Sequence, residues 1–448
     1  MSIDIETYRL KAQEAIEYVF VKEYHNSLGI PMPIVKMLLP DDANYSTGQY
    51  YITIDKTWQI HLNFGKLPIS YHEFQNEVKV LTRHEIEHYM CCPFDVITHF
   101  RMLKRIRDVY YKHFSHLGIN IEYACGAISN QAADIIVDTK NDYRHSKETL
   151  KSEIDWIKIG ANISACPRHC KLMFLTKEAI WKEDLGINET DPEFLKIVHQ
   201  LADSFTKNGI EDKSSFLDKV EEYAEIFFKL YVEDQKNPQQ SSQQGSQQQN
   251  GQQGSQQQSG QWGVGRPKDG DEHGNAFVFA DPDKVKEAIE VLAEETSVEE
   301  FIDLLAIAGI IGMSDKQKGV LWFNVQSANI IPIVEFSNTG NKSSYTYPSV
   351  WRIGDPIEEL DLMLTYMTSP RLIPGMTTKK WGYVSNDDNG TESKQMDLLL
   401  VVDTSGSMGS AMKESANMHQ AVLASYGILS YFESVSYTHL TLPTKLEV

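Results

Sequence analysis

The chain contains 448 residues, and its 42 Lys and Arg stand against 62 Asp and Glu, a formal net charge of −20. That length accommodates about three domains of roughly 150 residues each, and 41% hydrophobic with 10% aromatic residues exclude a wholly disordered chain. The excess of acid argues against a binder of nucleic acid or of anionic membranes, because phosphate groups are held mainly by clustered Lys and Arg.

Three features of the sequence predict a cytoplasmic protein. Residues 1–20 carry acids early and lack a basic stretch before an apolar core, so they predict an amphipathic helix rather than a signal peptide. The later apolar stretch at residues 301–313 is shorter than the roughly 20 residues of a membrane span. Five cysteines, an odd number, favour reduced thiols over a disulfide framework; they are Cys91, Cys92, Cys125, Cys166 and Cys170.

Residues 1–235 are expected to form one mostly helical domain with a small β-sheet. Residues 49–55 and 58–64 alternate apolar and polar side chains across a short gap, which predicts a two-stranded hairpin. Helical periodicity then dominates, at residues 72–90, 93–113, 123–143, 171–182 and 213–232.

An HExxH sequence at residues 84–88 is the sharpest chemical signal in this domain. Four residues make about one helical turn, so His84 and His88 project from the same helix face and can hold one Zn²⁺ ion. Glu85 is then placed to take a proton from a metal-bound water. The alternative is that the two histidines are surface residues, since HExxH also arises by chance.

A second helix, at residues 129–142, is expected to supply the third ligand. Asn130, Asp134, Asp138 and Asp142 recur every four residues, and the first three form a polar stripe on one face of the helix. A solvated acidic face is the alternative, but like charges at this spacing destabilise a helix unless a cation faces them. Asp134 is predicted as the third zinc ligand, Asp138 as the carboxylate that orients an imidazole, and Glu122 as the reserve ligand.

The pair Cys166 and Cys170 is spaced too closely for a zinc ribbon and has no matching second pair. Buried thiols are therefore expected there in preference to a structural metal site.

Composition divides the chain downstream. Residues 236–275 are rich in Gln, Ser and Gly, and predict a disordered linker, because so few apolar groups cannot offset the entropy of ordering it. Residues 276–394 predict a mixed helical and β region, with helices at 283–293 and 298–311 and a β-like stretch at 319–336. Residues 395–403 (QMDLLLVVD) predict a buried parallel strand, followed by a helix over 411–432.

A DxSxS sequence stands directly after that apolar run. Asp403, Ser405 and Ser407 offer oxygen atoms of the kind that Mg²⁺ prefers, at the carboxyl end of the predicted strand. Taken alone, the pattern fits a helix N-cap equally well.

Together these motifs carry a resemblance. MDLLLVVDTSGSMGS resembles the first strand and metal-ion-dependent adhesion site of a von Willebrand factor A (VWA) domain. With HExxH and NQAADIIVD upstream, the chain resembles the bacterial and archaeal VWA-like metallopeptidases. The resemblance implies an α+β chain, in which a zincin-like domain precedes a Rossmann-like α/β VWA domain, and a MoxR-type AAA+ ATPase as a common partner. It places zinc on His84, His88 and Asp134, catalysis on Glu85, and Mg²⁺ on Asp403, Ser405 and Ser407.

Residues 395–434 of this chain resemble only the N-terminal fragment of a VWA domain. The Thr and the second Asp that complete the cation site in that family are absent from this fragment. Residues 435–448 resemble a translated sequencing adaptor and are expected to be a non-native tail.

Three functions follow from these motifs. The first is a zinc-dependent peptidase that acts on protein substrates and docks its ATPase partner through the VWA cation site. The second is a non-catalytic VWA adaptor with a structural metal in the first domain, and the third is an assembly chaperone for an AAA+ ATPase. The presence of Glu85 favours the first, because a purely structural metal needs no general base.

Overall fold

The computed structural model describes residues 5–42, 45, 50–54, 58–64, 70–145, 147–159, 163–236, 281–310, 313–330, 343–369, 371–385 and 400–434. The chain divides into two compact units. The first is drawn from residues 1–327 and 406–423, and the second from residues 328–405 and 424–448. The predicted linker at 236–275, apart from its first residue, and the predicted tail at 435–448 lie outside the described residues.

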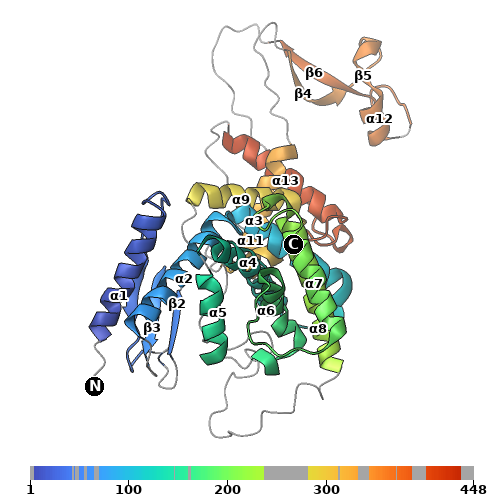
Figure 1. The fold of residues 1–448 in the computed structure, drawn as a ribbon. Coiled ribbons are helices and arrows are strands. Elements are labelled where there is room, and N and C mark those ends of the chain that lie inside the picture. Colours follow the sequence, from blue (N-terminus) through green and yellow to red (C-terminus); the bar gives the residue numbers. More distant parts are fainter. Residues whose placement is uncertain are drawn as a thin grey trace. The chain divides into compact units, whose positions relative to one another are not determined.

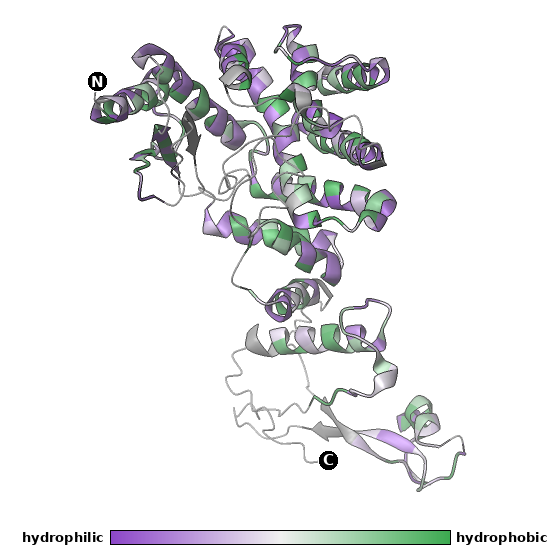
Figure 2. Cartoon of the chain, turned by 90° about the horizontal axis from the view of Figure 1, so that it is seen from below, coloured by the Kyte–Doolittle hydropathy of each residue, from purple (hydrophilic) through white to green (hydrophobic). Residues whose placement is uncertain are grey.

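The first unit is mainly helical (Figure 1). Its α-helices are α1 (Ile5–Glu17), α2 (Tyr71–Met90), α3 (Val96–Val109), α4 (Ile121–Arg144), α5 (Glu148–Ile159), α6 (Arg168–Trp181), α7 (Pro192–Thr206), α8 (Phe216–Lys236), α9 (Pro282–Glu295), α10 (Val298–Ile307) and α11 (Asp315–Ile330), the last as far as Ser327. Most helices in Figure 2 carry both hydrophobic and hydrophilic residues, as amphipathic helices around a shared core do. The helices predicted from periodicity in residues 1–235 and at 283–293 and 298–311 are therefore confirmed, with shifted ends.

The predicted hairpin is also confirmed. Strand β2 (Tyr50–Ile54) pairs antiparallel with β3 (Gln59–Phe64), with Ile52 opposite Leu62. A further strand, β1 (Ile34–Met37), pairs parallel with β3 on its other side, so the order is β1-β3-β2. This places β2 at an edge of the sheet, next to α2, with which it is in contact.

Helix α2 carries the HExxH sequence and is anchored at its start. Ser70 accepts a hydrogen bond from the Glu73 backbone and Glu73 accepts one from the Ser70 backbone, a capping box that satisfies the first turn. Phe74 is fully buried, with its ring 5.1 Å from Tyr8 and 5.7 Å from Phe64. The helix is therefore held against both α1 and the sheet before it reaches His84.

Helix α4 lies in the middle of the first unit and contacts α2, α3, α5, α6, α8 and α10. Its apolar residues, such as Ile128 and Ile135, are fully buried. Asp134 and Asp138 are buried too, so the predicted acidic stripe is not a solvated face. Carboxylates in such a position need a partner for their charge.

Ion pairs link α3 to α10 and, through Arg101 and Glu295, to α9. Lys104 of α3 lies 2.9 Å from Glu300, and Arg107 lies 2.7 Å from Asp303. Phe301, which stands between Glu300 and Asp303 in the sequence, is fully buried. The helices that follow the Gln-rich segment thus belong to the first unit, and amphipathic burial supported by ion pairs holds them there.

The predicted β-like stretch at residues 319–336 is wrong where the structure describes it, because α11 covers Asp315–Ile330. Buried positions recur every four residues, at Gly319, Phe323 and Ser327, which is a helical period. Trp322 and Phe323 pack against the ring of His419. A short apolar run fits a strand and a buried helix equally well, which explains the error.

The second unit contains a small antiparallel sheet with the order β4-β6-β5, formed by β4 (Ser343–Val350), β5 (Leu360–Asp361) and β6 (Lys379–Ser385), together with the short helix α12 (Leu362–Thr368). Of the strand predicted at 395–403, residues 395–399 lie outside the described residues. The described part, residues 400–403, is no strand, and Val401 is 81% exposed. An apolar strand needs hydrogen-bonding neighbours, and within the described residues neither sheet pairs with it. The helix predicted at 411–432 is present as α13 (Asn417–Ser434), which starts six residues later.

Where the structure describes the chain, the fold is thus mostly helical with two small sheets, which confirms the α+β class at this coarse level. Among the described residues, no helix combines the length and apolar character that crossing a membrane requires.

Candidate metal centre

One face of α2 presents both histidines of the HExxH sequence. The Nε2 atoms of His84 and His88 are 3.0 Å apart, and their rings meet edge to face. One helical turn separates the two residues, so their side chains lie next to one another as the sequence spacing predicts.

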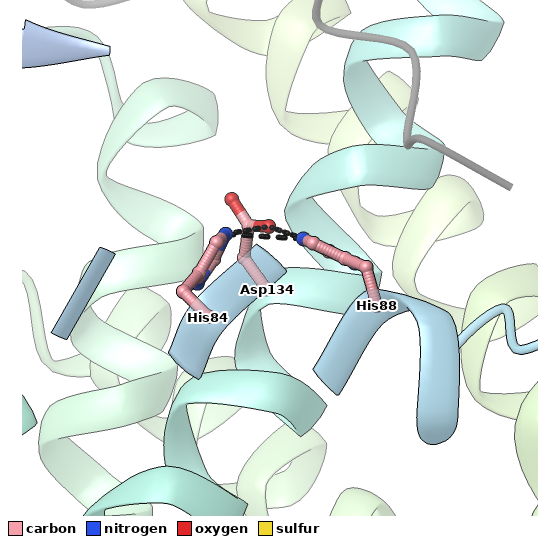
Figure 3. A group of neighbouring side chains, drawn as sticks. All are labelled: His84, His88 and Asp134. Atoms are coloured by element: carbon pink, nitrogen blue, oxygen red, sulfur yellow. Dashed lines mark hydrogen bonds and ion pairs between the residues drawn. The ribbon is translucent and has the colours of Figure 1, made fainter. Parts of the chain in front are cut away.

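Helix α4 brings Asp134 to the same point (Figure 3). Its Oδ1 atom is 3.5 Å from His84 Nε2 and 3.2 Å from His88 Nε2. Within the described residues these are the three side chains of metal-binding type that converge, with ligand atoms within 4.8 Å of one another. Glu122, the reserve ligand, is exposed at the start of α4, about three turns before Asp134.

Hydrogen bonds on the far side of each ligand determine which atom faces the centre. His84 Nδ1 lies 2.6 Å from Asp138 Oδ1, and His88 Nδ1 lies 2.9 Å from the Cys92 carbonyl oxygen. Both acceptors lack a proton, so each Nδ1 donates and Nε2 is the ring nitrogen that carries the lone pair in the neutral form. Asn130 donates to the other oxygen of Asp134 at 3.1 Å. Asp138 therefore lies where the sequence analysis placed it.

Three electron-rich atoms gathered in a buried site repel one another unless a positive charge lies between them. Burial lowers the pKa of His84, but the charges of Asp138, Asp134 and Glu85 outweigh burial and raise its pKa to about 9. At neutral pH a proton therefore supplies the positive charge in the metal-free protein. The same donor set fits a divalent cation, with two imidazoles and one carboxylate as its ligands.

Metal binding is therefore expected to release a proton. Because the pKa of His84 is raised to about 9, the site is protonated at pH 7, and a bound cation must displace about one proton. Affinity should rise with pH up to about 9 and then level off. Titration calorimetry in buffers of different ionisation enthalpy measures the released protons. The same proton count at pH 7 and pH 10 would contradict this assignment.

Glu85, the predicted general base, is half-buried on α2 and lies close enough to His84 to raise the pKa of that residue by its charge. Beside His88 lies a small cavity of about 10 Å³, lined in part by Pro93, His99 and Asn130. That volume is about the size of one water molecule. Of the three side chains in the metal-binding group, His88 borders this cavity.

Lys177 and Glu153 were not found from the sequence. Lys177 Nζ lies 2.5 Å from Asp138 Oδ2 and 2.6 Å from Glu153 Oε1, deep inside the first unit. The sequence signal was a lysine within the apolar run KLMFLTKEAIW of α6, where a solvent-facing charge is not expected.

None of the five cysteines belongs to the metal-binding group found among the described residues. All five are free thiols, and four are buried. Burial raises the pKa of Cys91 and Cys92, and raises that of Cys170 to about 12, so these thiols stay protonated. Cys166 is half-buried and is not part of the metal-binding group. Cys170 is thus a buried thiol as expected, whereas Cys166 is only half-buried.

The residues of the DxSxS sequence are exposed to solvent. Ser405 donates through its backbone nitrogen to Asp403 Oδ1 at 2.8 Å and through its hydroxyl to Oδ2 at 3.1 Å. Ser407 follows in a short 3₁₀ turn, Gly406–Met408. These hydrogen bonds satisfy Asp403 locally, as in a turn that a short polar side chain stabilises. A Mg²⁺ site at Asp403, Ser405 and Ser407 stays a prediction.

Comparison of the chain with protein-family models, with curated proteins and with solved structures finds no match in any of the three.

Proposed function

We propose that the chain is a zinc-dependent peptidase of the zincin type. The observation that supports this most directly is that His84, His88 and Asp134 aim three lone-pair atoms at one point. Two imidazoles and a carboxylate form the donor set of catalytic zinc sites, whereas Mg²⁺ prefers oxygen ligands alone. When bound, the ion would make a coordinated water acidic near neutral pH and polarise a peptide carbonyl.

The chain's own residues would perform the remaining steps. His84 and His88 hold the ion through Nε2, because their Nδ1 atoms are engaged by Asp138 and by the Cys92 carbonyl. Glu85 accepts the proton of the attacking water at its carboxylate and returns it to the leaving amine. Its position next to His84 on α2 supports this role.

Strand β2 is the proposed holding site for the substrate. It lies at the edge of the sheet and contacts α2, the helix that carries the metal ligands. An edge strand can pair its backbone with an extended polypeptide, independently of side-chain sequence. This favours a protein or peptide substrate.

A non-catalytic metal module remains the second candidate, and one observation favours it. His88 is 3% exposed and Asp134 1% exposed, which is more burial than a peptidase substrate can reach without local opening. Under this alternative the metal would stabilise the packing of α2 on α4, and the chain would act as an adaptor or assembly chaperone.

Chelation tests the peptidase proposal. We expect the purified full chain to contain about one zinc per molecule and to cleave an unstructured protein such as casein. Treatment with 1,10-phenanthroline should abolish cleavage, and added Zn²⁺ should restore it. Cleavage that survives complete removal of the metal would overturn the proposal, and zinc binding without any cleavage would favour the adaptor.

We also propose that Asp403, Ser405 and Ser407 form a Mg²⁺ site through which a MoxR-type AAA+ ATPase docks. The supporting observations are the DxSxS spacing and the solvent exposure of all three residues. Ser405→Ala is expected to weaken capture of such an ATPase in Mg²⁺. Capture that is equal in Mg²⁺ and in EDTA would contradict this.

A further inference from the structure

A fully buried lysine stands behind the metal-binding group. Lys177 is 1% exposed, and its ammonium pairs with Asp138 of α4 and Glu153 of α5. Burial disfavours its charge, but the two carboxylates outweigh that effect and keep the pKa of Lys177 above its usual value. A charge in this position is tolerated only because it is paired on both sides.

The two oxygens of Asp138 are engaged by different partners. Oδ1 accepts from His84 Nδ1 at 2.6 Å, and Oδ2 accepts from Lys177 at 2.5 Å. A carboxylate held at both oxygens cannot turn about its own axis. His84 is therefore aligned by a chain of contacts that starts at Lys177, although Lys177 touches none of the three proposed ligands in the described contacts.

We propose that Lys177 is a positioning residue of the metal centre, which locks Asp138 so that His84 presents Nε2 to the ion. This inference rests on the metal site of the proposed function, but not on catalysis. It assigns a role to α6, a helix that contributes none of the three proposed ligands, and it explains why Lys177 is fully buried there.

The direction of the change in metal affinity distinguishes a positioning role of Lys177 from a purely electrostatic one. Lys177 is a cation near a cation site, so by charge alone its removal would tighten metal binding. Positioning predicts the reverse, because an unlocked Asp138 leaves His84 free to rotate. Outer partners of metal ligands typically contribute 10- to 100-fold to affinity, and we expect Lys177→Met to lose about that much.

Lys171 offers a matched control on the same helix. It is also buried, at 8% exposure, and it pairs with Glu189 at 2.9 Å. Lys171→Met breaks a comparable ion pair in α6 away from the metal-binding group. We expect it to cost stability without changing metal affinity, so it accounts for any loss that comes from weakened folding alone.

The experiment measures metal binding by the full chain, with Zn²⁺ competed against a chromophoric chelator and with Co²⁺ as a spectroscopic probe. Lys177→Met should weaken Zn²⁺ binding and change the visible Co²⁺ bands, which report ligand geometry, while Lys171→Met should leave both as in the wild type. The double variant Lys177→Met with Asp138→Asn should bind no more weakly than Asp138→Asn alone, because both changes break one chain of contacts.

Each outcome decides between the ideas. If Lys177→Met binds Zn²⁺ as tightly as the wild type or more tightly, or if its effect adds fully to that of Asp138→Asn, the positioning role is overturned and the peptidase proposal stands. If Zn²⁺ binding follows the expected pattern but the wild type cleaves nothing, the positioning role stands and the peptidase proposal falls. A wild type that binds no metal overturns both.

Discussion

Glu85→Gln is expected to keep the bound zinc and to lose cleavage by about 10²- to 10⁴-fold, the usual contribution of a general base. The change removes a proton acceptor but no metal ligand, and Gln has nearly the shape of Glu. Zinc content by mass spectrometry and cleavage of a quenched fluorescent peptide measure the two effects separately.

Glu77→Gln is the matched control for this change. Glu77 lies on α2 about two turns before Glu85 and is also half-buried. It should keep both zinc and activity. If Glu85→Gln cleaves as fast as this control, Glu85 is not the base, and the structural-metal alternative gains.

Asp134→Asn is expected to reduce zinc affinity by more than about a hundredfold, which exceeds the usual effect of an outer partner. In the wild type, the carboxylate Oδ1 of Asp134 lies 3.2 Å from His88 Nε2 and 3.5 Å from His84 Nε2. The amide of Asn carries no negative charge to hold a cation there. Zinc at 100 times its dissociation constant should stabilise the wild type by about 2.7 kcal/mol, and the variant should not gain this stability. Thermal unfolding with and without zinc measures the difference.

Asp142→Asn controls for the loss of a buried carboxylate from the same helix. Asp142 is 6% exposed two turns further along α4, and its Oδ1 accepts from the Leu150 backbone, a bond that Asn also makes. Burial raises the pKa of Asp142, so its negative charge is less favourable in the folded than in the unfolded chain, and the neutral Asn side chain removes that cost. This variant should bind zinc as the wild type does; an equal loss in both variants would mean that Asp134 is no ligand.

The predictable part of the site lies within single helices. The spacing of His84 and His88 and that of Asp134 and Asp138 follow from about 3.6 residues per turn, so each pair shares a face before any tertiary contact forms. The hairpin of β2 and β3 was equally readable, because strand alternation and a short gap are local signals.

The incorrect secondary-structure predictions lie where a local sequence pattern is compatible with more than one structure. The apolar run in residues 319–330 fits a strand as well as a helix, and burial of Trp322 and Phe323 against His419 accompanies the helical form. The run at 400–403 has strand character, but a strand exists only with neighbours, and hydrogen-bonded neighbours are supplied by distant parts of a chain.

By itself, the amino-acid sequence determined that His84 and His88 would share a helix face, that a carboxylate stripe on a second helix was available to meet them, and that the chain would be mostly helical. Only the tertiary structure decided that Asp134 rather than Glu122 faces the imidazoles, that Cys92 and Asp138 engage the two Nδ1 atoms, and that Lys177, 39 residues beyond Asp138, locks the arrangement from α6. The physical reason is that helix periodicity is a local property of the backbone, whereas the partners of a buried charge are chosen by how separate helices pack.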